Sequence, residues 1–266
     1  MSDFDYWKRQ EKKPLFPEVD TWQPEQRRFA GKLLIIGGNK GAFFAAAKAM
    51  ETANQMGVGE VRVLLPDSLR GNLPKMPELY FAKSEASGAF GKVSMVDMME
   101  HLAWAESVLI AGDLGRNAET SVAFAQFMKM CDKPVTITRD GIDVLTPDVM
   151  NWGMRDEKTA LFLTMPQLQK LLRTLYYPKV ITLSMPQSQL VETLHKFTLS
   201  FPLSIVTYHN EQIVIAHDGN VISEDITDTD YSQITFWDGR VMARFAVLSL
   251  WNRELSSEKV LARAIL

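Results

Sequence analysis

The chain has 266 residues, of which 46% are hydrophobic and 23% are charged, the balance of a folded globular protein rather than of a disordered one. Its 29 basic and 32 acidic side chains leave a formal charge of −3, so no global positive field attracts nucleic acid or an anionic membrane. The single cysteine, Cys131, excludes an internal disulfide framework and a multi-cysteine zinc site.

The histidines and the N-terminal segment bear on two further classes, metal-binding proteins and secreted or membrane proteins. We predict no metal site, because the four histidines lack the close spacing of metal ligands: His101, His195, His209 and His217. Residues 1–13 are charged and aromatic without an apolar run, unlike a signal peptide. No stretch approaches the roughly 20 apolar residues that span a bilayer. We therefore expect a cytoplasmic protein.

The first 30 residues are predicted to form an arm ahead of one domain over 31–266. Prolines interrupt this arm, and three of its aromatic side chains are able to anchor it to the domain: Trp7, Phe16 and Trp22. Beyond the arm, the continuous apolar run 33–36 is typical of a strand buried on both faces. A glycine-rich turn, a helix over 42–56 and a strand over 61–65 follow, in the order of a right-handed parallel unit.

The alternation continues along the chain. It predicts further strands over 107–111, 135–138 and 160–164, helices over 119–130 and 167–175, strands over 205–208 and 212–216 at polar turns, and an apolar last helix over 241–251. The predicted fold is therefore α/β, with a mostly parallel central sheet and helices on both faces.

Two glycine turns, 37–41 and 112–115, each follow a predicted parallel strand. Gly38 and Gly41 fit the second and third positions of the dinucleotide fingerprint G-x-G-x-x-G, but Ile36 occupies the first. Such turns present backbone N–H groups to phosphate, and ligands of open α/β sheets bind beyond the carboxyl ends of the strands. A tight turn with close helix packing explains the glycines equally well.

The residues alone identify no set of nucleophile, base and orienting group. Three aspartates gather near the end of the 135–138 strand, where a charged loop accounts for them equally well: Asp140, Asp143 and Asp148.

Five segments match the motifs of one known family in order and spacing. Residues 26–39 read QRRFAGKLLIIGGN where the family has HKGDFGRVLVIGGS, and residues 41–66 are similar to its GA…AALRAGAGLVTVAVP. IAGDLGR at 110–116 resembles IGPGLGR, PVTITRDGI at 134–142 resembles PVVLDADAL, and LTMP at 163–166 resembles the start of LTPHPGE. Over roughly 26–251 the chain therefore resembles the NAD(P)H-hydrate dehydratases of the ribokinase-like superfamily.

This resemblance implies a ribokinase-like fold and an enzyme that uses ADP or ATP to dehydrate hydrated NADH or NADPH. The family's motif before its last buried helix is GSGD, whose glycines open an anion hole and whose aspartate is the base. Here the aligned residues are Trp237, Asp238, Gly239 and Arg240. Arg240 thus replaces the base, and a guanidinium cannot accept a proton.

Other motif positions differ as well. Thr138 replaces the first aspartate of DADAL, whereas Asp140 keeps the second. Pro166 and Gln167 stand at the histidine of TPH, and Thr207 and Tyr208 stand at the lysine and glycine of a later KGA motif. Scaffold residues are retained while chemical ones are not, which favours a diverged relative.

Two hypotheses remain open. The chain is either a non-catalytic relative, which binds a nucleotide or phosphate or acts in assembly or regulation, or an active dehydratase, a carbon–oxygen lyase, with Asp238 or Asp140 as base. A small-molecule kinase of the same superfamily would lack the same aspartate. ATP or ADP is the expected cofactor and hydrated NADH or NADPH the expected substrate. We expect a homo-oligomer without nucleic-acid or membrane partners. The predicted ligand-contacting residues are Gly38, Asn39, Gly41, Asp113, Gly115, Gly239 and Arg240.

Arg240 is also expected in the first turn of the last helix, where a cation faces the positive end of the helix dipole. Either a carboxylate compensates, from Asp238 or Asp140, or this turn binds an anion.

Overall fold

The computed structural model describes residues 5–11, 13–225 and 237–266, and its strands form one ten-stranded sheet. In chain order they are β1 (Trp7–Gln10), β2 (Lys32–Gly37), β3 (Glu60–Pro66), β4 (Leu79–Ala82), β5 (Ser107–Gly112), β6 (Val135–Thr138), β7 (Thr159–Leu163), β8 (Leu203–His209), β9 (Gln212–His217) and β10 (Asn220–Asp225). Their order across the sheet is β1-β10-β9-β8-β7-β6-β5-β2-β3-β4. Strand β9 runs antiparallel to both of its neighbours, and the other pairs are parallel.

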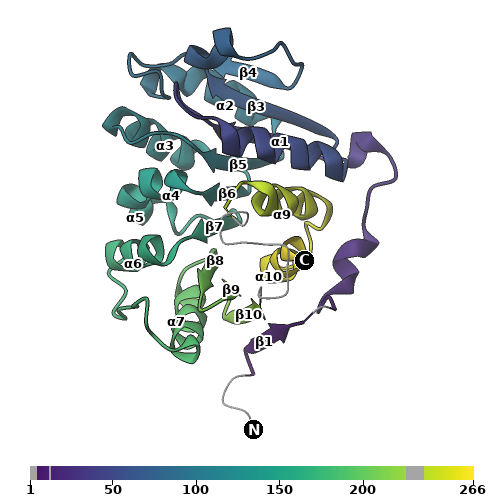
Figure 1. Ribbon diagram of the computed structural model, residues 1–266, viewed down its shortest axis with the longest axis vertical. Helices are drawn as coiled ribbons and strands as arrows, with labels where there is room; N and C mark the ends of the chain where they lie inside the picture. The colour runs from purple at the N-terminus through teal and green to yellow at the C-terminus, as the bar shows by residue number, and fades with distance from the viewer. Residues whose placement is uncertain (1–4, 12, 226–236) are drawn as a thin grey trace.

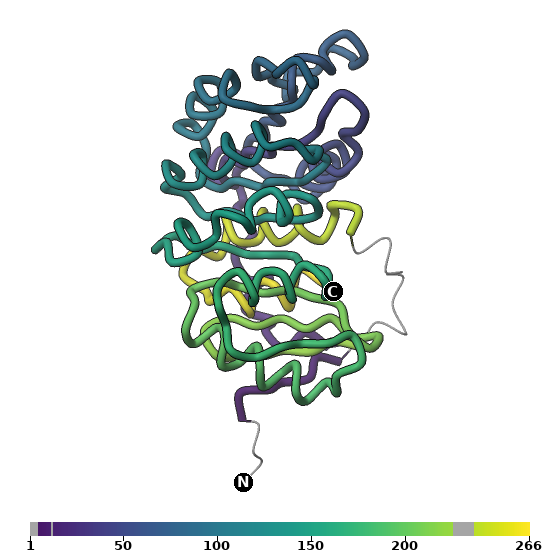
Figure 2. The backbone as a smooth tube through the Cα atoms, turned by 90° about the vertical axis from the view of Figure 1, so that its left-hand side faces the viewer, coloured from purple at the N-terminus to yellow at the C-terminus, as the bar shows by residue number. Residues whose placement is uncertain are grey.

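Helices cover both faces of this sheet (Figure 1). They are α1 (Phe44–Met56), α2 (Met95–Trp104), α3 (Ala118–Met130), α4 (Asp140–Leu145), α5 (Val149–Trp152), α6 (Met165–Thr174), α7 (Gln187–Ser200), α9 (Arg240–Trp251) and α10 (Ser257–Ile265). The layer from α2 to α7 lies on one face, which is turned toward the viewer in Figure 2, while α1, α9 and α10 cover the other. The predicted α/β architecture with a mostly parallel sheet is confirmed.

The two layers explain why the central strands are continuous apolar runs. In β2, Leu34 and Ile36 belong to the core under the α2–α7 layer, and Leu33 and Ile35 to the core under α1, α9 and α10. All four side chains are fully buried. Each such side chain contributes about 1.5–3 kcal/mol relative to an exposed one.

The N-terminal segment contributes a strand of its own. β1 pairs in parallel with β10, and Trp7 Nε1 donates to Ser223 Oγ at 2.9 Å. Phe16 packs against the core beneath α9 and α10. The predicted anchoring by Trp22 is wrong, since its side chain is 74% exposed and Val19 supplies the buried apolar contact instead. The segment then passes along α10 and α9 to β2, as Figure 1 shows.

Within the described ranges, no helix has both the length and the apolar character needed to cross a membrane. Residues 1–4 and 12 of the predicted arm lie outside the described residues.

Candidate functional site

The two predicted glycine turns lie together at the carboxyl ends of β2 and β5, where they bond to each other. Gly38 N–H donates to Gly112 O at 2.9 Å, and Asn39 Nδ2 donates to Asp113 O at 2.6 Å. Gly38 and Gly112 have φ of +90° and +95°, a conformation that glycine adopts without a Cβ penalty. The structure thus brings the two turns into one cluster.

The backbone donors of Gly41 and Gly115, one in each turn, already have acceptors within the chain. Gly41 N–H donates to Asn39 Oδ1 at 2.8 Å, and Gly115 N–H donates to Asp140 Oδ2 at 3.0 Å. A phosphate that used these two donors would have to replace protein acceptors.

Asp113 joins the second turn to the start of α1. Its Oδ2 accepts from Ala45 N–H at 3.1 Å, and its Oδ1 pairs with Arg139 Nη2 at 2.7 Å. The carboxylate lies at the positive end of a 13-residue helix, where negative charge is stabilised. Asp113 is buried with a φ of +58°, which aspartate tolerates better than most residues.

Arg139 is the site residue that sequence reasoning missed. Besides its pair with Asp113, its Nη1 donates to Trp237 O at 3.2 Å, so it connects the end of β5 to the segment before α9. Gln167 Nε2 in turn donates to Arg139 O at 2.8 Å. The motif comparison considered only the flanking positions 138 and 140, and the φ of +56° at Arg139 has no sequence signal.

Asp140, a predicted base, begins α4 beside Arg139. Its Oδ2 accepts from Gly115 N–H, whereas its Oδ1 is buried and has no hydrogen-bond partner among the described residues. Burial raises the pKa of Asp140 above its usual range, and the Gly115 donor opposes this shift. A half-buried carboxyl with a raised pKa has the properties of a general base.

The N-terminus of α9 holds the last group of predicted residues. Gly239 has a φ of +107°, and a Cβ there would lie 2.8 Å from Ala45 O in α1. Arg240 is the first residue of the helix, as predicted. Asp238 Oδ1 accepts from Arg240 N–H at 3.0 Å, and Asp238 Oδ2 accepts from Nε at 2.8 Å and pairs with Nη2 at 2.6 Å. The compensating carboxylate is therefore that of Asp238.

The remaining motif positions lie in α6 and in strands β6 and β8. Gln167 caps α6, where its Oε1 accepts from Thr164 N–H at 3.0 Å. Thr138 and Thr207 are fully buried, and their hydroxyls have no partner in the described part of the chain. Across the described residues, no group of three or more histidine, cysteine, aspartate or glutamate side chains is placed to hold a metal ion.

Comparisons with known proteins identify the fold and show which proteins this chain is similar to. No family model matches the chain. A curated relative, the bifunctional NAD(P)H-hydrate repair enzyme Nnr of Salinibacter ruber, is 24% identical over 157 residues. That match covers 56% of this chain and 29% of the relative, so the chain aligns with less than a third of the bifunctional enzyme.

Two solved structures illustrate the structural likeness. A ribokinase-like superfamily protein from Enterococcus faecalis superimposes with a TM-score of 0.71 at 15% identity, over 98% of this chain and 86% of that one. An ADP/ATP-dependent NAD(P)H-hydrate dehydratase from Bacillus subtilis, co-crystallised with ATP and Mg²⁺, superimposes with a TM-score of 0.60 at 13% identity, over 96% and 87%. The chain thus has the ribokinase-like fold, and its structural neighbours include NAD(P)H-hydrate dehydratases.

Proposed function

We propose that this chain is a diverged relative of the NAD(P)H-hydrate dehydratases that lacks dehydratase activity and binds a nucleotide or phosphate at the carboxyl ends of its strands. The observation that carries the proposal is the Asp238–Arg240 pair at the start of α9. The resemblance assigns the base and the anion hole of the parent activity to this turn.

The Asp238–Arg240 pair is the reason that we expect no dehydratase activity. A guanidinium stays charged at any physiological pH and cannot take a proton. Both oxygens of Asp238 accept hydrogen bonds from Arg240, so Asp238 is held as a counter-ion. Loss of a general base typically lowers the rate by about 10²–10⁴-fold.

The same pair supports anion binding. A backbone N–H at a helix N-terminus and an adjacent guanidinium already hold one anionic group, the Asp238 carboxylate. A phosphate offers the same charge sign and acceptor oxygens to the same donors. On this proposal the Asp238 side chain leaves when the ligand binds, and the affinity reflects that exchange.

Thermal stabilisation by inorganic phosphate, ADP and ATP tests the binding part, since a ligand of the native state raises its melting temperature. Arg240→Ala should reduce the stabilisation. Asp238→Asn, which removes the competing charge, should increase it. Arg253→Ala removes an exposed arginine near the other end of α9 and is the matched control. The binding proposal is wrong if none of these ligands stabilises the parent or Asp238→Asn, or if Arg240→Ala behaves like the control.

A second candidate, an active dehydratase, is favoured by Asp140 and its buried, unpartnered Oδ1. Incubation with hydrated NADH and ATP or ADP separates the two functions through the absorbance of recovered NADH. We expect no recovery from the parent protein. Recovery that Asp140→Asn abolishes, while Asp143→Asn leaves it intact, would establish the active enzyme instead.

We further propose one domain over 31–266 preceded by the arm 1–30, a cytoplasmic location, and a homo-oligomer without nucleic-acid or membrane partners. The formal charge of −3 supports the absence of those two partners. Light scattering on the purified protein tests the oligomeric state.

A further inference from the structure

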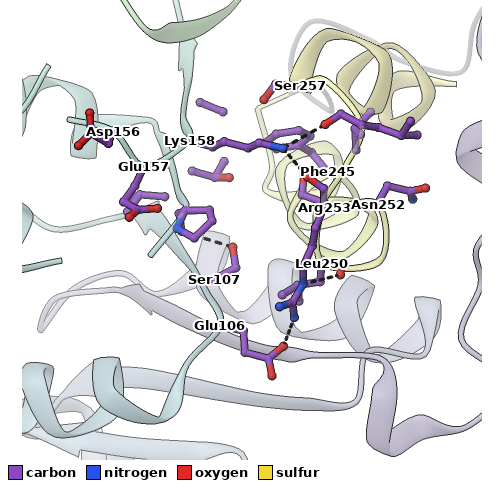
Figure 3. A pocket seen from close by; sticks show the side chains of 17 residues that line it. Glu106, Ser107, Asp156, Glu157, Lys158, Phe245, Leu250, Asn252, Arg253 and Ser257 are labelled. Carbon is purple, nitrogen blue, oxygen red and sulfur yellow. Dashed lines mark hydrogen bonds and ion pairs between the residues drawn. The ribbon is translucent and has the colours of Figure 1, made fainter. Parts of the chain in front are cut away.

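A cavity of about 330 Å³ lies at the opposite edge of the sheet from the candidate site (Figure 3). It is bounded by the amino-terminal ends of β5 and β6, by the segment entering β7, and by the last turns of α9 with the loop to α10. The candidate site lies at the carboxyl ends of the same strands. The cavity is therefore a separate feature, with a volume in the range of small-molecule pockets, about 300–1,000 Å³.

Most of its wall is apolar. Its apolar lining residues include Val135, Ala160, Phe245, Leu250, Leu255 and Val260. Protein interiors are close-packed, and voids larger than a water molecule are few. A ligand that fills this space would gain the dispersion contacts that the wall lacks.

The two positively charged side chains that line the cavity, Lys158 and Arg253, already have partners within the chain. Lys158 reaches from the β7 side to the α9–α10 loop, as Figure 3 shows, and its Nζ donates to Arg253 O at 2.7 Å and Leu255 O at 3.0 Å. The guanidinium of Arg253 pairs with Glu106. These contacts tie the loop to the edge of the sheet and leave neither cation as an obvious receptor for an anion.

Two acidic side chains of the lining, unlike the basic ones, have no such partners in the described part of the chain. Asp156 and Glu157 line the same cavity. Among the described residues, the carboxylates of Asp156 and Glu157 have no hydrogen-bond or ion-pair partner, whereas that of Glu106 is paired. The unpaired charge of the lining is thus entirely negative.

We propose that this cavity binds a small amphiphilic amine, whose ammonium group pairs with Asp156 and Glu157 and whose apolar body packs between the sheet and α9. An ammonium group supplies three donors, and charge-assisted hydrogen bonds are roughly twice as strong as neutral ones. The apolar wall selects against strongly hydrated cations without a hydrophobic part.

The probe for the test is 2-phenylethylamine, with phenylacetate as the counterpart of opposite charge, each titrated by calorimetry. We expect saturable binding of the amine and none of phenylacetate. The double variant Asp156→Asn/Glu157→Gln should weaken amine binding at least about tenfold, as expected for lost hydrogen bonds to charged groups. Glu119→Gln, an exposed acidic residue on α3, should leave it unchanged.

A cavity-filling variant, Ser249→Phe, provides independent evidence because Ser249 lines the cavity from α9. It should abolish amine binding, and its melting curve without ligand reports whether the fold tolerates the larger side chain. If Ser249→Phe does not fold, the binding data for the double variant Asp156→Asn/Glu157→Gln decide the proposal. The proposal is overturned if the amine does not bind, if phenylacetate binds equally well, or if the double variant binds the amine like the parent.

Discussion

Glu224 should make the stability of this protein depend on pH near neutrality. Its side chain is 4% exposed on β10, and its Oε2 accepts from Gln10 Nε2 of β1 at 2.7 Å. Burial raises the pKa of Glu224 from 4.5 to about 7, although the Gln10 donor and the charge of Arg244 act in the opposite direction. The pair lies at the seam where the N-terminal strand joins the sheet.

The magnitude follows from the two pKa values. At 1.36 kcal/mol per pH unit, a rise from 4.5 to about 7 corresponds to about 3 kcal/mol. Below pH 4.5 the carboxyl is protonated in both the folded and the unfolded chain, so it costs no charge burial. Between pH 4.5 and 7 only the unfolded chain ionises, and the free energy of unfolding falls as pH rises. Above pH 7 the full cost of about 3 kcal/mol applies.

Urea unfolding of the parent and Glu224→Gln between pH 4.5 and 8.5 measures this effect. The glutamine keeps an acceptor for Gln10 and carries no charge, so the variant should match the parent near pH 4.5 and exceed it by about 3 kcal/mol at pH 8. Glu254→Gln, an exposed site next to α9, is the control and should follow the parent. Parallel pH profiles for the parent and Glu224→Gln would refute the reasoning.

Two further substitutions test the packing of the candidate site by urea unfolding. Gly239→Ala should cost about 1–3 kcal/mol of backbone strain, because φ is +107° and the new Cβ would lie 2.8 Å from a backbone oxygen of α1. Gly71→Ala, with no atom within 4 Å of its Cβ, should cost far less, and equal losses would contradict the geometry. Asp113→Asn should cost about 1.5–3 kcal/mol by weakening charged hydrogen bonds. Conversion of the partly exposed Asp143, which pairs with Lys170 and accepts a hydrogen bond from Gln167, to asparagine should cost less than about 1 kcal/mol, because asparagine keeps an acceptor for Gln167. Similar losses at Asp113 and Asp143 would contradict the assignment.

The central strands were predictable because their signal is local. Leu33 to Ile36 are buried on both faces, and the uninterrupted apolar run that they form is typical of a strand covered on both sides. The start of α9 could be predicted equally well, because Gly239 marks where the apolar run of the last helix must begin. In both cases, the residues that carry the signal are neighbours in the sequence.

The N-terminal strand and the site contacts depend on distant residues instead. Gln10 is buried because it meets Glu224 and donates to Ala262 O at 2.8 Å, more than 200 residues away. Nothing near Gln10 in the sequence distinguishes it from an exposed polar residue. Arg139 was missed for the same reason, because its partners Asp113 and Trp237 come from other strands and loops.

The aspartates of the candidate site show what ligand binding would require. Asp113 accepts from the first turn of α1, Asp140 from the second glycine turn, and Asp238 from the first turn of α9. In an enzyme preorganised for phosphate, donors like these stay available for the ligand and for developing charge. In this protein, each of these backbone donors already binds the carboxylate of an aspartate in the chain. A phosphate that replaces such a carboxylate therefore gains only the difference in free energy between two similar sets of hydrogen bonds. Opposite effects of Asp238→Asn and Arg240→Ala on phosphate binding therefore distinguish a site that exchanges anions from one that its own side chains have closed.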